Sequence, residues 1–213
     1  MPKQHSSAAK SPSLPLVVAI TGASGGVYAV RLLEVLLQAG IDVHLLISPS
    51  GSAVLKQELD LSVNLDRFDP AGLLPPSKTP ETAAGRLIYH QHADFMAPVA
   101  SGSFLTGGMV VCPCSGGTLS GIAHASSANL IERAADVHLK ERRKLILVPR
   151  ETPLSIIQLD NMRRAAEAGA VILPAMPGWY HGVRTLDDLV NFVVARILDQ
   201  LGVPHSLMQR WGE

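Results

Sequence analysis

The sequence predicts an α/β fold with a mainly parallel sheet, and two segments carry most of that prediction. Residues 17–48 have the pattern of a strand, a glycine-rich turn, a helix and a second strand, which is the order of a βαβ unit. Residues 108–120 repeat its first half, because an apolar strand again runs into a turn of glycine and hydroxyl residues and then a helix. Ligands of open parallel sheets bind beyond the carboxyl ends of the strands. We therefore expect the two turns to hold one ligand between them.

The first unit is predicted in detail by its apolar spacing. Residues 16–21 are apolar and rich in β-branched side chains, as expected of a buried strand. The small residues Gly22–Gly26 let a ligand approach the backbone closely. Apolar residues then recur at three and four positions over 27–38, which predicts a helix that ends near Gly40. Such a turn directs N–H groups and the positive end of the helix dipole at a ligand, which favours a phosphate.

The glycine spacing argues against a dinucleotide. The turn reads G-A-S-G-G, whereas the dinucleotide fingerprint is G-x-G-x-x-G. The second strand ends in Ser48, where an NAD-binding unit usually carries an acidic residue for the ribose. A hydroxyl group thus replaces the carboxylate. The sequence favours a mononucleotide or another phosphate ester, and the alternative is a tight turn that binds nothing.

Composition limits the class of protein. A chain of 213 residues with 47% hydrophobic content can bury one sizeable core, so we expect a single domain over 16–213. Lys plus Arg equal Asp plus Glu at 18 each, which leaves no overall field to attract nucleic acid or an anionic membrane. Residues 1–15 are rich in Ser, Pro, Ala and Lys and lack an apolar stretch of signal-peptide length. We expect a disordered N-terminal tail and a cytoplasmic protein.

The two cysteines, Cys112 and Cys114, are separated by one residue. This spacing is too close for an ordinary structural disulfide. Two thiolates are too few for a structural zinc site. We predict that both are buried as small apolar side chains and that the chain binds no metal.

The segments between the two turns carry weaker signals. Residues 49–60 suit a short helix, in which Glu58 either faces the site or is a solvated surface carboxylate. Residues 61–86 are rich in Pro, Asp, Gly and Ser and predict a loop with at most a helical turn. A strand is predicted over 87–90, and residues 92–103 resemble a binding loop or the start of a helix.

A third strand end adds charged side chains to the same edge of the sheet. Residues 128–143 have helical periodicity and gather four basic side chains, which is a pattern typical of a solvated face. The strand over 144–149 then delivers Arg150 and Glu151 to its carboxyl end. An arginine there can form two parallel hydrogen bonds with a phosphate, and the carboxylate can exchange protons or stabilise a cation. A structural salt bridge is the alternative.

The last quarter of the sequence predicts two helices and one strand. A helix is expected over 152–168, with an apolar side made by Ile156, Ile157, Leu159 and Met162. A buried strand over 171–176 leads to Trp179 and Tyr180, which either pack a flat ligand or cover the core.

The helix expected over 185–201 places Arg196 among apolar residues, and a buried arginine usually has an anionic partner. Its expected buried residues are Leu186, Leu189, Val193 and Ile197. The final segment, 205–213, carries Trp211, which we expect to pack on its own site or on a neighbouring subunit.

Five segments resemble the flavin prenyltransferases of the UbiX and Pad1 family. These segments are ITGASGGVYAVRLLE, VVCPCSGGTLSGIA, NLIERAADVHLKERRKLILVPRE, ILPAMPGWYH and RWGE. The resemblance implies a Rossmann-like, three-layer flavoprotein fold that assembles into a dodecamer. It implies metal-independent transfer of a dimethylallyl group from dimethylallyl monophosphate to N5 and C6 of reduced FMN. The product, prenylated FMN, would serve a UbiD-type decarboxylase, for example in ubiquinone biosynthesis.

The resemblance also implies the site residues. Flavin contacts are implied at Gly22, Ala23, Ser24, Ser48, Ser115, Gly116, Gly117, Thr118 and Arg150. The prenyl phosphate, held between subunits in the family, is implied to bind Arg133, Lys140, Tyr180 and Arg196. Glu151 matches the acidic residue beside the reacting centre, and Ser24 matches a hydroxyl near it. Further pocket positions are Glu58, Trp211 and Phe95, the last of which is a tryptophan in some relatives.

Two other interpretations stay open at this point. The run Ala125–Asn129 loosely resembles the phosphopantothenoylcysteine decarboxylase group, whose FMN-dependent enzymes act on cysteine-derived thiols. No convincing match to that group's catalytic histidine is found. A non-catalytic FMN carrier is the other alternative, and the basic cluster argues against it because the single phosphate of FMN does not need so many cations.

Overall fold

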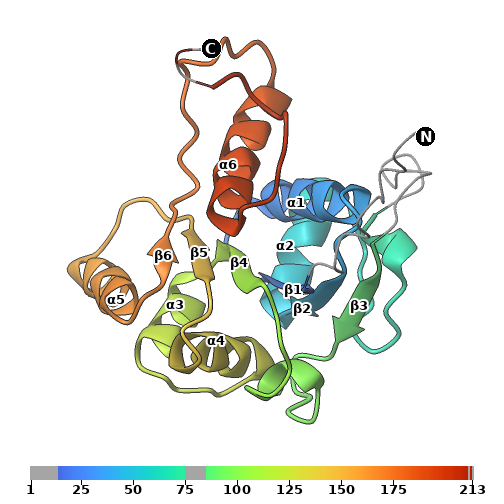
Figure 1. The fold of residues 1–213 in the computed structure, drawn as a ribbon, viewed down its shortest axis with the longest axis vertical. Helices are drawn as coiled ribbons and strands as arrows, with labels where there is room; N and C mark the ends of the chain where they lie inside the picture. The colour runs from blue at the N-terminus through green and yellow to red at the C-terminus, as the bar shows by residue number, and fades with distance from the viewer. Residues whose placement is uncertain (1–13, 75–84, 211, 213) are drawn as a thin grey trace, which may run out of the picture.

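The computed structural model describes residues 14–74, 85–210 and 212 and shows an α/β fold of three layers (Figure 1). Within the described residues, six parallel strands form one sheet in the order β3-β2-β1-β4-β5-β6. The strands are β1 (Leu16–Ile20), β2 (Val43–Ile47), β3 (Leu87–His90), β4 (Gly108–Cys114), β5 (Leu145–Pro149) and β6 (Val171–Ile172). The predicted fold class is confirmed. Of the predicted tail over 1–15, residues 1–13 lie outside the described residues, and the single domain over 16–213 stays a prediction.

The strand order places two turns at the centre of one sheet edge. The chain first winds from β1 to β3 and then starts again from β4 on the other side of β1, so β1 and β4 are neighbours. Their register pairs Leu16 with Gly108 and Ala19 with Val111. In a doubly wound sheet this switch of direction opens a crevice at the carboxyl ends of the strands. Both predicted turns lie there.

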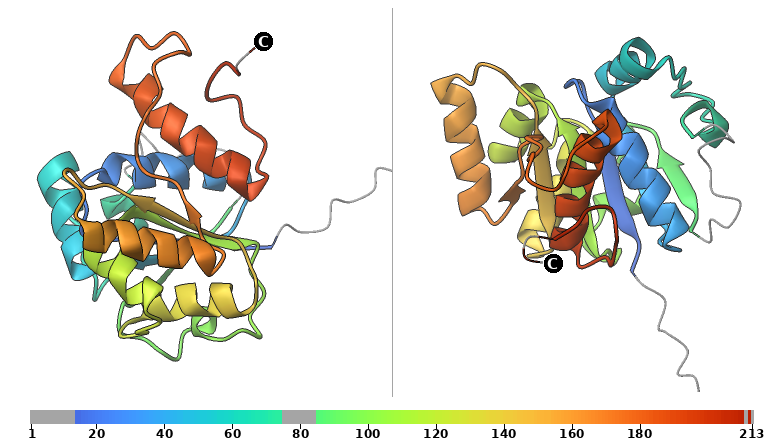
Figure 2. Two further views of the ribbon diagram at one scale, coloured as in Figure 1. Left: turned by 90° about the vertical axis from the view of Figure 1, so that its left-hand side faces the viewer. Right: turned by 90° about the horizontal axis from the view of Figure 1, so that it is seen from above.

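Helices cover both faces of the sheet (Figure 2). The helices α1 (Gly26–Gln38), α2 (Pro49–Leu59) and α6 (Leu186–Leu201) pack on one face. The helices α3 (Gly116–Ala123), α4 (Leu130–Lys140) and α5 (Ile156–Glu167) pack on the other. Two short 3₁₀ turns, η1 (Pro70–Gly72) and η2 (Pro98–Ala100), lie in the loops that flank β3. No helix of the described residues is long and apolar enough to cross a membrane.

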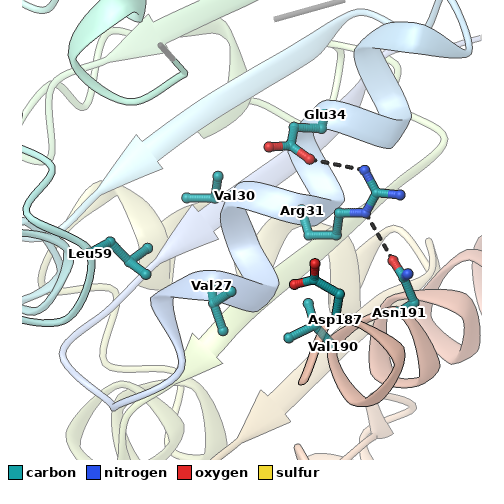
Figure 3. Close-up of a pocket in the computed structure, with 8 residues that line it drawn as sticks. All are labelled: Val27, Val30, Arg31, Glu34, Leu59, Asp187, Val190 and Asn191. Atoms are coloured by element: carbon teal, nitrogen blue, oxygen red, sulfur yellow. Dashed lines mark hydrogen bonds and ion pairs between the residues drawn. The ribbon is translucent and has the colours of Figure 1, made fainter. Parts of the chain in front are cut away.

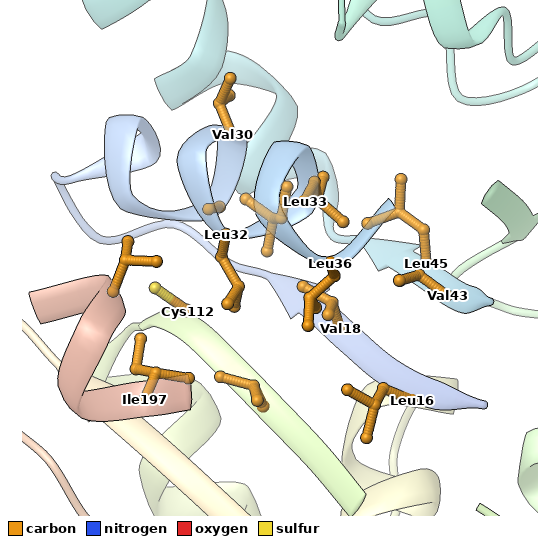
Figure 4. Packing of buried hydrophobic residues seen from close by; sticks show 14 of the residues in the cluster. Leu16, Val18, Val30, Leu32, Leu33, Leu36, Val43, Leu45, Cys112 and Ile197 are labelled. Carbon is orange, nitrogen blue, oxygen red and sulfur yellow. The ribbon is translucent and has the colours of Figure 1, made fainter. Parts of the chain in front are cut away.

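The core follows from the alternation of side chains along the strands. In β1, Val18 points to the α1 and α6 face, whereas Val17 points to the opposite face. Both clusters are fully apolar, which is the pattern of a parallel sheet buried on two sides. Cys112 belongs to the same cluster as Leu32 of α1 and Ile197 of α6 (Figure 4).

Both cysteines are free and buried, as predicted. Burial raises the pKa of the Cys114 thiol to about 12 and also raises the pKa of Cys112. The thiols are therefore neutral at physiological pH and pack as small apolar groups.

Three predictions about the C-terminal half were wrong. The helix predicted from 152 begins at Ile156, because Ser155 caps it and forms a capping box with Gln158. Of its predicted apolar side, Ile156 is 78% and Ile157 is 74% exposed, whereas Met162 packs against the core, and the fully buried positions are Asn161 and Ala165. In α6, Leu186 is 80% exposed because it lies in the first turn, beyond the part of the helix that packs on the sheet.

The strand predicted over 171–176 is regular only at Val171 and Ile172. The N–H groups of Leu173 and Ala175 still donate to β5 carbonyl groups, at 2.8 and 3.0 Å. The segment thus continues along β5 as an irregular sheet edge that includes Pro174, and prolines are tolerated at such edges.

Candidate functional site

Thr21 joins the two central turns at the carboxyl edge of the sheet. Its hydroxyl donates to the Pro113 carbonyl group at 2.7 Å and accepts from the Ser115 N–H group at 2.8 Å. The side chain is 1% exposed. The turn after β1 and the turn after β4 are therefore held in one fixed arrangement. Sequence reasoning missed this residue, although a threonine between an apolar strand and a glycine turn is a signal for it.

Only glycine fits at the start of the first turn. A Cβ atom on Gly22 would lie 2.6 Å from both Cβ and Oγ of Ser50 in α2. Three residues on, Gly25 has a positive φ of 112°, a conformation that glycine adopts without strain. The turn after β1 is thus pressed against the N-terminal turn of α2.

The amides at the N-terminus of α1 are already occupied by Glu58. Its Oε2 atom accepts from the Gly25 and Gly26 N–H groups at 2.9 and 3.0 Å, and its carboxylate also bonds the Ser24 side chain. Burial acts to raise the pKa of this carboxyl, but the hydrogen bonds outweigh it and hold the pKa below its ordinary value. An ionised carboxylate thus caps α1.

The expectation that this turn offers its amides to a phosphate was therefore wrong for Gly25 and Gly26. A second anion at these two amides would displace Glu58 or be repelled by it. The expectation that Glu58 faces the site is supported by the same contacts.

Two other helices begin at the same edge with serine caps. Ser48 Oγ accepts from Gly51 N at 3.0 Å at the start of α2. Ser115 Oγ accepts from Thr118 N at 3.4 Å at the start of α3 and donates to the Thr118 hydroxyl at 3.1 Å. The first N–H groups of a helix have no partner within it. Each serine takes up one of these N–H groups, and Pro49 at the start of α2 has none, so the N–H groups of Ser50, Gly116 and Gly117 are the ones left to bind an anion.

Arg150 and Glu151 follow β5, as predicted. Arg150 Nε donates to the Ser24 carbonyl oxygen at 3.2 Å, which brings a cation against the first turn. Glu151 is exposed, and its Oε1 atom accepts from Thr152 N at 3.0 Å. Both residues line a cavity of about 60 Å³ together with Met162 and Met176. Among the described residues neither takes part in an ion pair, so the salt-bridge alternative is not supported there.

The residues of this edge fit a flavin mononucleotide. The Gly22–Ser24 turn allows close approach, the starts of α2 and α3 offer hydroxyl and amide donors, and Arg150 supplies a positive charge. A Cβ atom on Gly117 would meet nothing within 4 Å, so the first turn of α3 is open on this side. The G-A-S-G-G spacing of the first turn, which differs from the dinucleotide fingerprint, agrees with a mononucleotide.

The four residues expected to bind prenyl phosphate fall into two pairs. Arg133 and Lys140 lie on α4, where Arg133 Nε donates to the Ala100 carbonyl oxygen at 3.1 Å and Lys140 pairs with Glu141. Tyr180 lies after β6, and Arg196 lies on α6. Because α4 and α6 cover opposite faces of the sheet (Figure 2), one chain does not bring the two pairs together.

The second pair is more exposed than the sequence suggested. Arg196 was expected among buried residues, but its side chain is 45% exposed and its anionic partner is Asp199, at 2.8 Å. It lies on the outer side of α6 because the inner side is filled by Val193 and Ile197. Tyr180 is 55% exposed and packs edge-on against Phe192, with ring centroids 5.6 Å apart.

Two further predicted pocket residues complete the set. Phe95 lies in the loop after β3 and is 47% exposed. Trp211 lies outside the described residues. No group of three or more His, Cys, Asp or Glu side chains in the described part of the chain is arranged to hold a metal ion.

Another cavity of about 400 Å³ lies between α1 and α6 (Figure 3), and its lining includes Val27 and Leu59, the chain neighbours of Gly26 and Glu58. Arg31 of α1 crosses it, donating to Asn191 of α6 at 2.9 Å and to Glu34 at 3.0 Å. Its other walls are largely apolar, including Val27 and Val190. The arginine ties the two helices together.

Curated relatives and solved structures agree on one family. The sequence model of the family described as Flavoprotein matches residues 4–198. A relative from Alkalihalophilus pseudofirmus, named flavin prenyltransferase UbiX, is 52% identical over 202 residues, covering 93% of this chain and 96% of the relative. A relative of the same name from Pseudomonas aeruginosa is 49% identical over 198 residues, covering 93% and 94%.

Solved structures give the same result. The structure of AnUbiX (PadA1) in complex with FMN and dimethylallyl pyrophosphate has a TM-score of 0.81 at 38% identity, covering 94% of this chain and 98% of that one. The dodecameric FMN-dependent UbiX-like decarboxylase from Escherichia coli O157:H7 has a TM-score of 0.80 at 39% identity, covering 94% and 100%. The peptidyl-cysteine decarboxylase EpiD, at 15% identity and a TM-score of 0.55 with 88% and 97% covered, shares the fold alone. With these similarities along nearly its whole length, the chain belongs to the UbiX/Pad1 family of flavin prenyltransferases, within the flavoproteins.

Proposed function

We propose that this protein transfers a dimethylallyl group from dimethylallyl monophosphate to N5 and C6 of reduced FMN and releases inorganic phosphate. The observation that carries the proposal is the sheet edge on which the first turn, the starts of α2 and α3, and Arg150 form one cradle. Reduced FMN supplies the two nucleophilic atoms. The chain's own residues bind it, orient it, manage protons and neutralise the leaving phosphate.

The flavin phosphate is proposed to bind at the starts of α2 and α3. Ser48 and Ser115 already place hydroxyl groups there, and the helix dipoles favour an anion. Glu58 excludes the same group from α1. Gly22–Ser24 and Gly116–Thr118 would then contact the remainder of the flavin, with Arg150 beside it.

Proton transfer is proposed for Ser24, Glu58 and Glu151. The bond at N5 replaces the N5 proton, and ring closure adds a proton to the prenyl double bond and removes the proton from C6, so the site needs both a proton donor and proton acceptors near the flavin. The Ser24 side chain bonds the Glu58 carboxylate, which connects a hydroxyl group to an ionised acceptor. Glu151 is proposed to move a proton during ring closure together with the released phosphate. An active Glu151→Gln variant with normal turnover would contradict that role.

The prenyl phosphate is proposed to bind between subunits. A monophosphate is a poor leaving group, so Arg, Lys and Tyr donors must stabilise the negative charge that develops on it. Arg133 and Lys140 lie on one face of the chain, and Tyr180 and Arg196 lie on the other. A second copy of the chain is needed to combine them, so we propose a homo-oligomer of the kind described for the dodecameric neighbour, with Phe95 and Trp211 as further pocket residues.

Anaerobic incubation with reduced FMN and dimethylallyl monophosphate, followed by mass spectrometry of the released flavin, tests the proposal. We expect a flavin heavier by one five-carbon prenyl unit, and no such product from Arg150→Ala. A parallel reaction with the diphosphate identifies the preferred donor. Unmodified flavin from both donors, released by a protein that binds FMN well, would contradict prenyl transfer.

Two predictions extend beyond the reaction itself. The product is proposed to be the cofactor of a UbiD-type decarboxylase, and the cytoplasmic location predicted from composition stays a prediction.

The cysteine-decarboxylase alternative is not favoured, because relatives named flavin prenyltransferase are far more similar in sequence than the cysteine decarboxylases.

A further inference from the structure

The cavity between α1 and α6 is lined by residues that the proposed reaction does not use (Figure 3). Its volume of about 400 Å³ lies within the range of small-molecule pockets. Three helices contribute apolar walls, namely Val27 and Val30 from α1, Leu59 from α2 and Val190 from α6. None of the lining residues is among those proposed to bind the flavin or the prenyl phosphate. The cavity is therefore available for a second ligand.

Two of the charged residues in the lining neutralise each other. Arg31 Nη1 donates to Glu34 Oε2 at 3.0 Å, and Arg31 Nε donates to Asn191 Oδ1 at 2.9 Å. The Glu34 side chain is 12% exposed, so this ion pair is partly shielded from water. Arg31 and Glu34 thus form a fixed wall with no net charge.

The remaining charged residue, Asp187, keeps an unpaired carboxylate. Its side chain points from α6 toward α1 (Figure 3) and has no hydrogen-bond or ion-pair partner among the residues that the structure describes. The next residue, Asp188, is the one that caps α6, because its Oδ2 atom accepts from Thr185 N at 2.9 Å. The helix dipole also favours an acidic residue in this first turn, but it supplies Asp187 with no hydrogen-bond donor. The lining therefore carries one net negative charge beside apolar walls.

We propose that this cavity is a second binding site, for an organic monocation that carries one protonated amine on an apolar body. The ammonium group donates hydrogen bonds to the Asp187 carboxylate, and the body packs on the valine and leucine walls. An anion does not fit, because Asp187 and Glu34 repel it and Arg31 is already bound. The ligand contacts both α1 and α6, so its binding stabilises the folded chain. The proposal is independent of prenyl transfer.

Three probes with the same body and different charges test the site. We expect 2-phenylethylammonium to bind the FMN-loaded protein at least about threefold more tightly than the neutral 2-phenylethanol, and the anionic 3-phenylpropanoate to bind more weakly than both. Titration calorimetry measures the three affinities. Raising the ionic strength should weaken binding of the ammonium probe and leave binding of the alcohol nearly unchanged, because salt screens the contact with Asp187.

Two variants and one control assign the binding to this cavity. Asp187→Asn should lower the affinity for the ammonium probe to that for the alcohol and leave the affinity for the alcohol unchanged. Asp160→Asn is the matched control, because it removes an exposed carboxylate on α5, which covers the other face of the sheet, and it should change neither affinity. Val190→Phe should weaken binding of all three probes, because the larger ring fills the cavity, and thermal unfolding verifies that this variant is folded.

Several outcomes overturn the proposal. Equal affinities for the ammonium probe and the alcohol, or an unchanged ammonium affinity in Asp187→Asn, contradict recognition of a cation by this carboxylate. An ammonium probe that binds only in the absence of FMN occupies the flavin cradle instead. No binding of any probe to the wild type means that solvent or a neighbouring chain fills the cavity. A failed prenyl-transfer assay affects none of these measurements, so the two proposals are tested separately.

Discussion

At the scale of single residues, the site depends on side chains that hold the backbone rather than touch a ligand. Thr21 locks the first turn to the turn after β4. Glu58 occupies the N-terminus of α1, which the glycine pattern had predicted as a phosphate site. Asp199 plays the same kind of role for Arg196. Where an anionic ligand can bind thus depends on which helix N-termini still have N–H groups without a partner.

Replacing Glu58 should make the first turn less stable. Glu58→Gln keeps the size of the side chain but removes the charge that caps α1, so we expect a loss of about 1 kcal/mol or less at neutral pH, since the group is partly solvated. The folded-state pKa of Glu58 lies below its ordinary value, so its contribution is present above that ordinary pKa and is lost as pH falls through the folded-state pKa. Urea unfolding of both proteins at neutral and acidic pH measures this. Equal stabilities at neutral pH would contradict the capping role.

Two glycines of the site should respond differently to alanine. Gly22→Ala places a Cβ atom 2.6 Å from Ser50 and should cost about 1–3 kcal/mol of unfolding free energy. Gly117→Ala meets nothing within 4 Å, so stability should be nearly unchanged while FMN affinity falls, because the ligand is proposed to approach there. Thermal unfolding and fluorescence titration with FMN separate the two effects. Unchanged FMN affinity in Gly117→Ala would place the flavin elsewhere.

At the scale of elements, the sequence predicts the helices and strands whose buried apolar residues recur at a regular spacing within one segment. The unit from β1 to β2 follows directly from its apolar spacing, because α1 buries one clear face on the sheet. In α5 the apolar residues Ile156 and Ile157 point outward, since periodicity shows that a face is apolar but not what covers it. The contacts of Asp199 with His205 and Arg210 could also not be predicted from the sequence, because they depend on how the chain folds back after α6.

Acid should destabilise the fold at the edge of the sheet where β2 pairs with β3, because a histidine pair lies there. His44 Nδ1 and His90 Nε2 are 2.7 Å apart, their rings stack, and His44 packs edge-on against Phe104. Burial lowers the pKa of both, and the charge on a protonated His90 lowers the pKa of His44 further. A depressed folded-state pKa means that stability is present above the ordinary histidine pKa and is lost as pH falls below it.

We therefore expect the free energy of unfolding to fall between about pH 7 and pH 5, and the fall to be shallower in His44→Gln. Urea unfolding across this range measures the slope. The surface residue His124 offers a control, because His124→Gln removes an exposed imidazole and should leave the slope nearly unchanged. Parallel slopes in the wild type and His44→Gln would contradict the role of the pair.

At the scale of the whole molecule, the residues proposed to bind the prenyl phosphate are divided between two faces of the chain. The proposed flavin cradle lies at the carboxyl edge of the sheet, where Thr21 joins the first turn to the turn after β4 and Arg150 contacts the first turn. The cations of α4 lie on one face, and Tyr180 and Arg196 lie on the other. A symmetric assembly that apposes unlike faces of neighbouring chains would complete one site per interface. Binding of the prenyl donor then depends on assembly.

This division predicts that two inactive variants restore each other. Arg133→Ala and Arg196→Ala should each lose prenyl transfer, because each removes a donor to the leaving phosphate. In oligomers assembled from both variants, about a quarter of the interfaces receive Arg133 from one chain and Arg196 from another, so about a quarter of the wild-type activity should return. Co-expression with two different affinity tags and sequential purification gives the mixed species for assay. A mixture of Arg133→Ala with Lys140→Ala is the matched control, because both positions lie on the same helix and no interface regains a complete set. If the first mixture stays inactive, Arg133 and Arg196 do not serve one site from different chains.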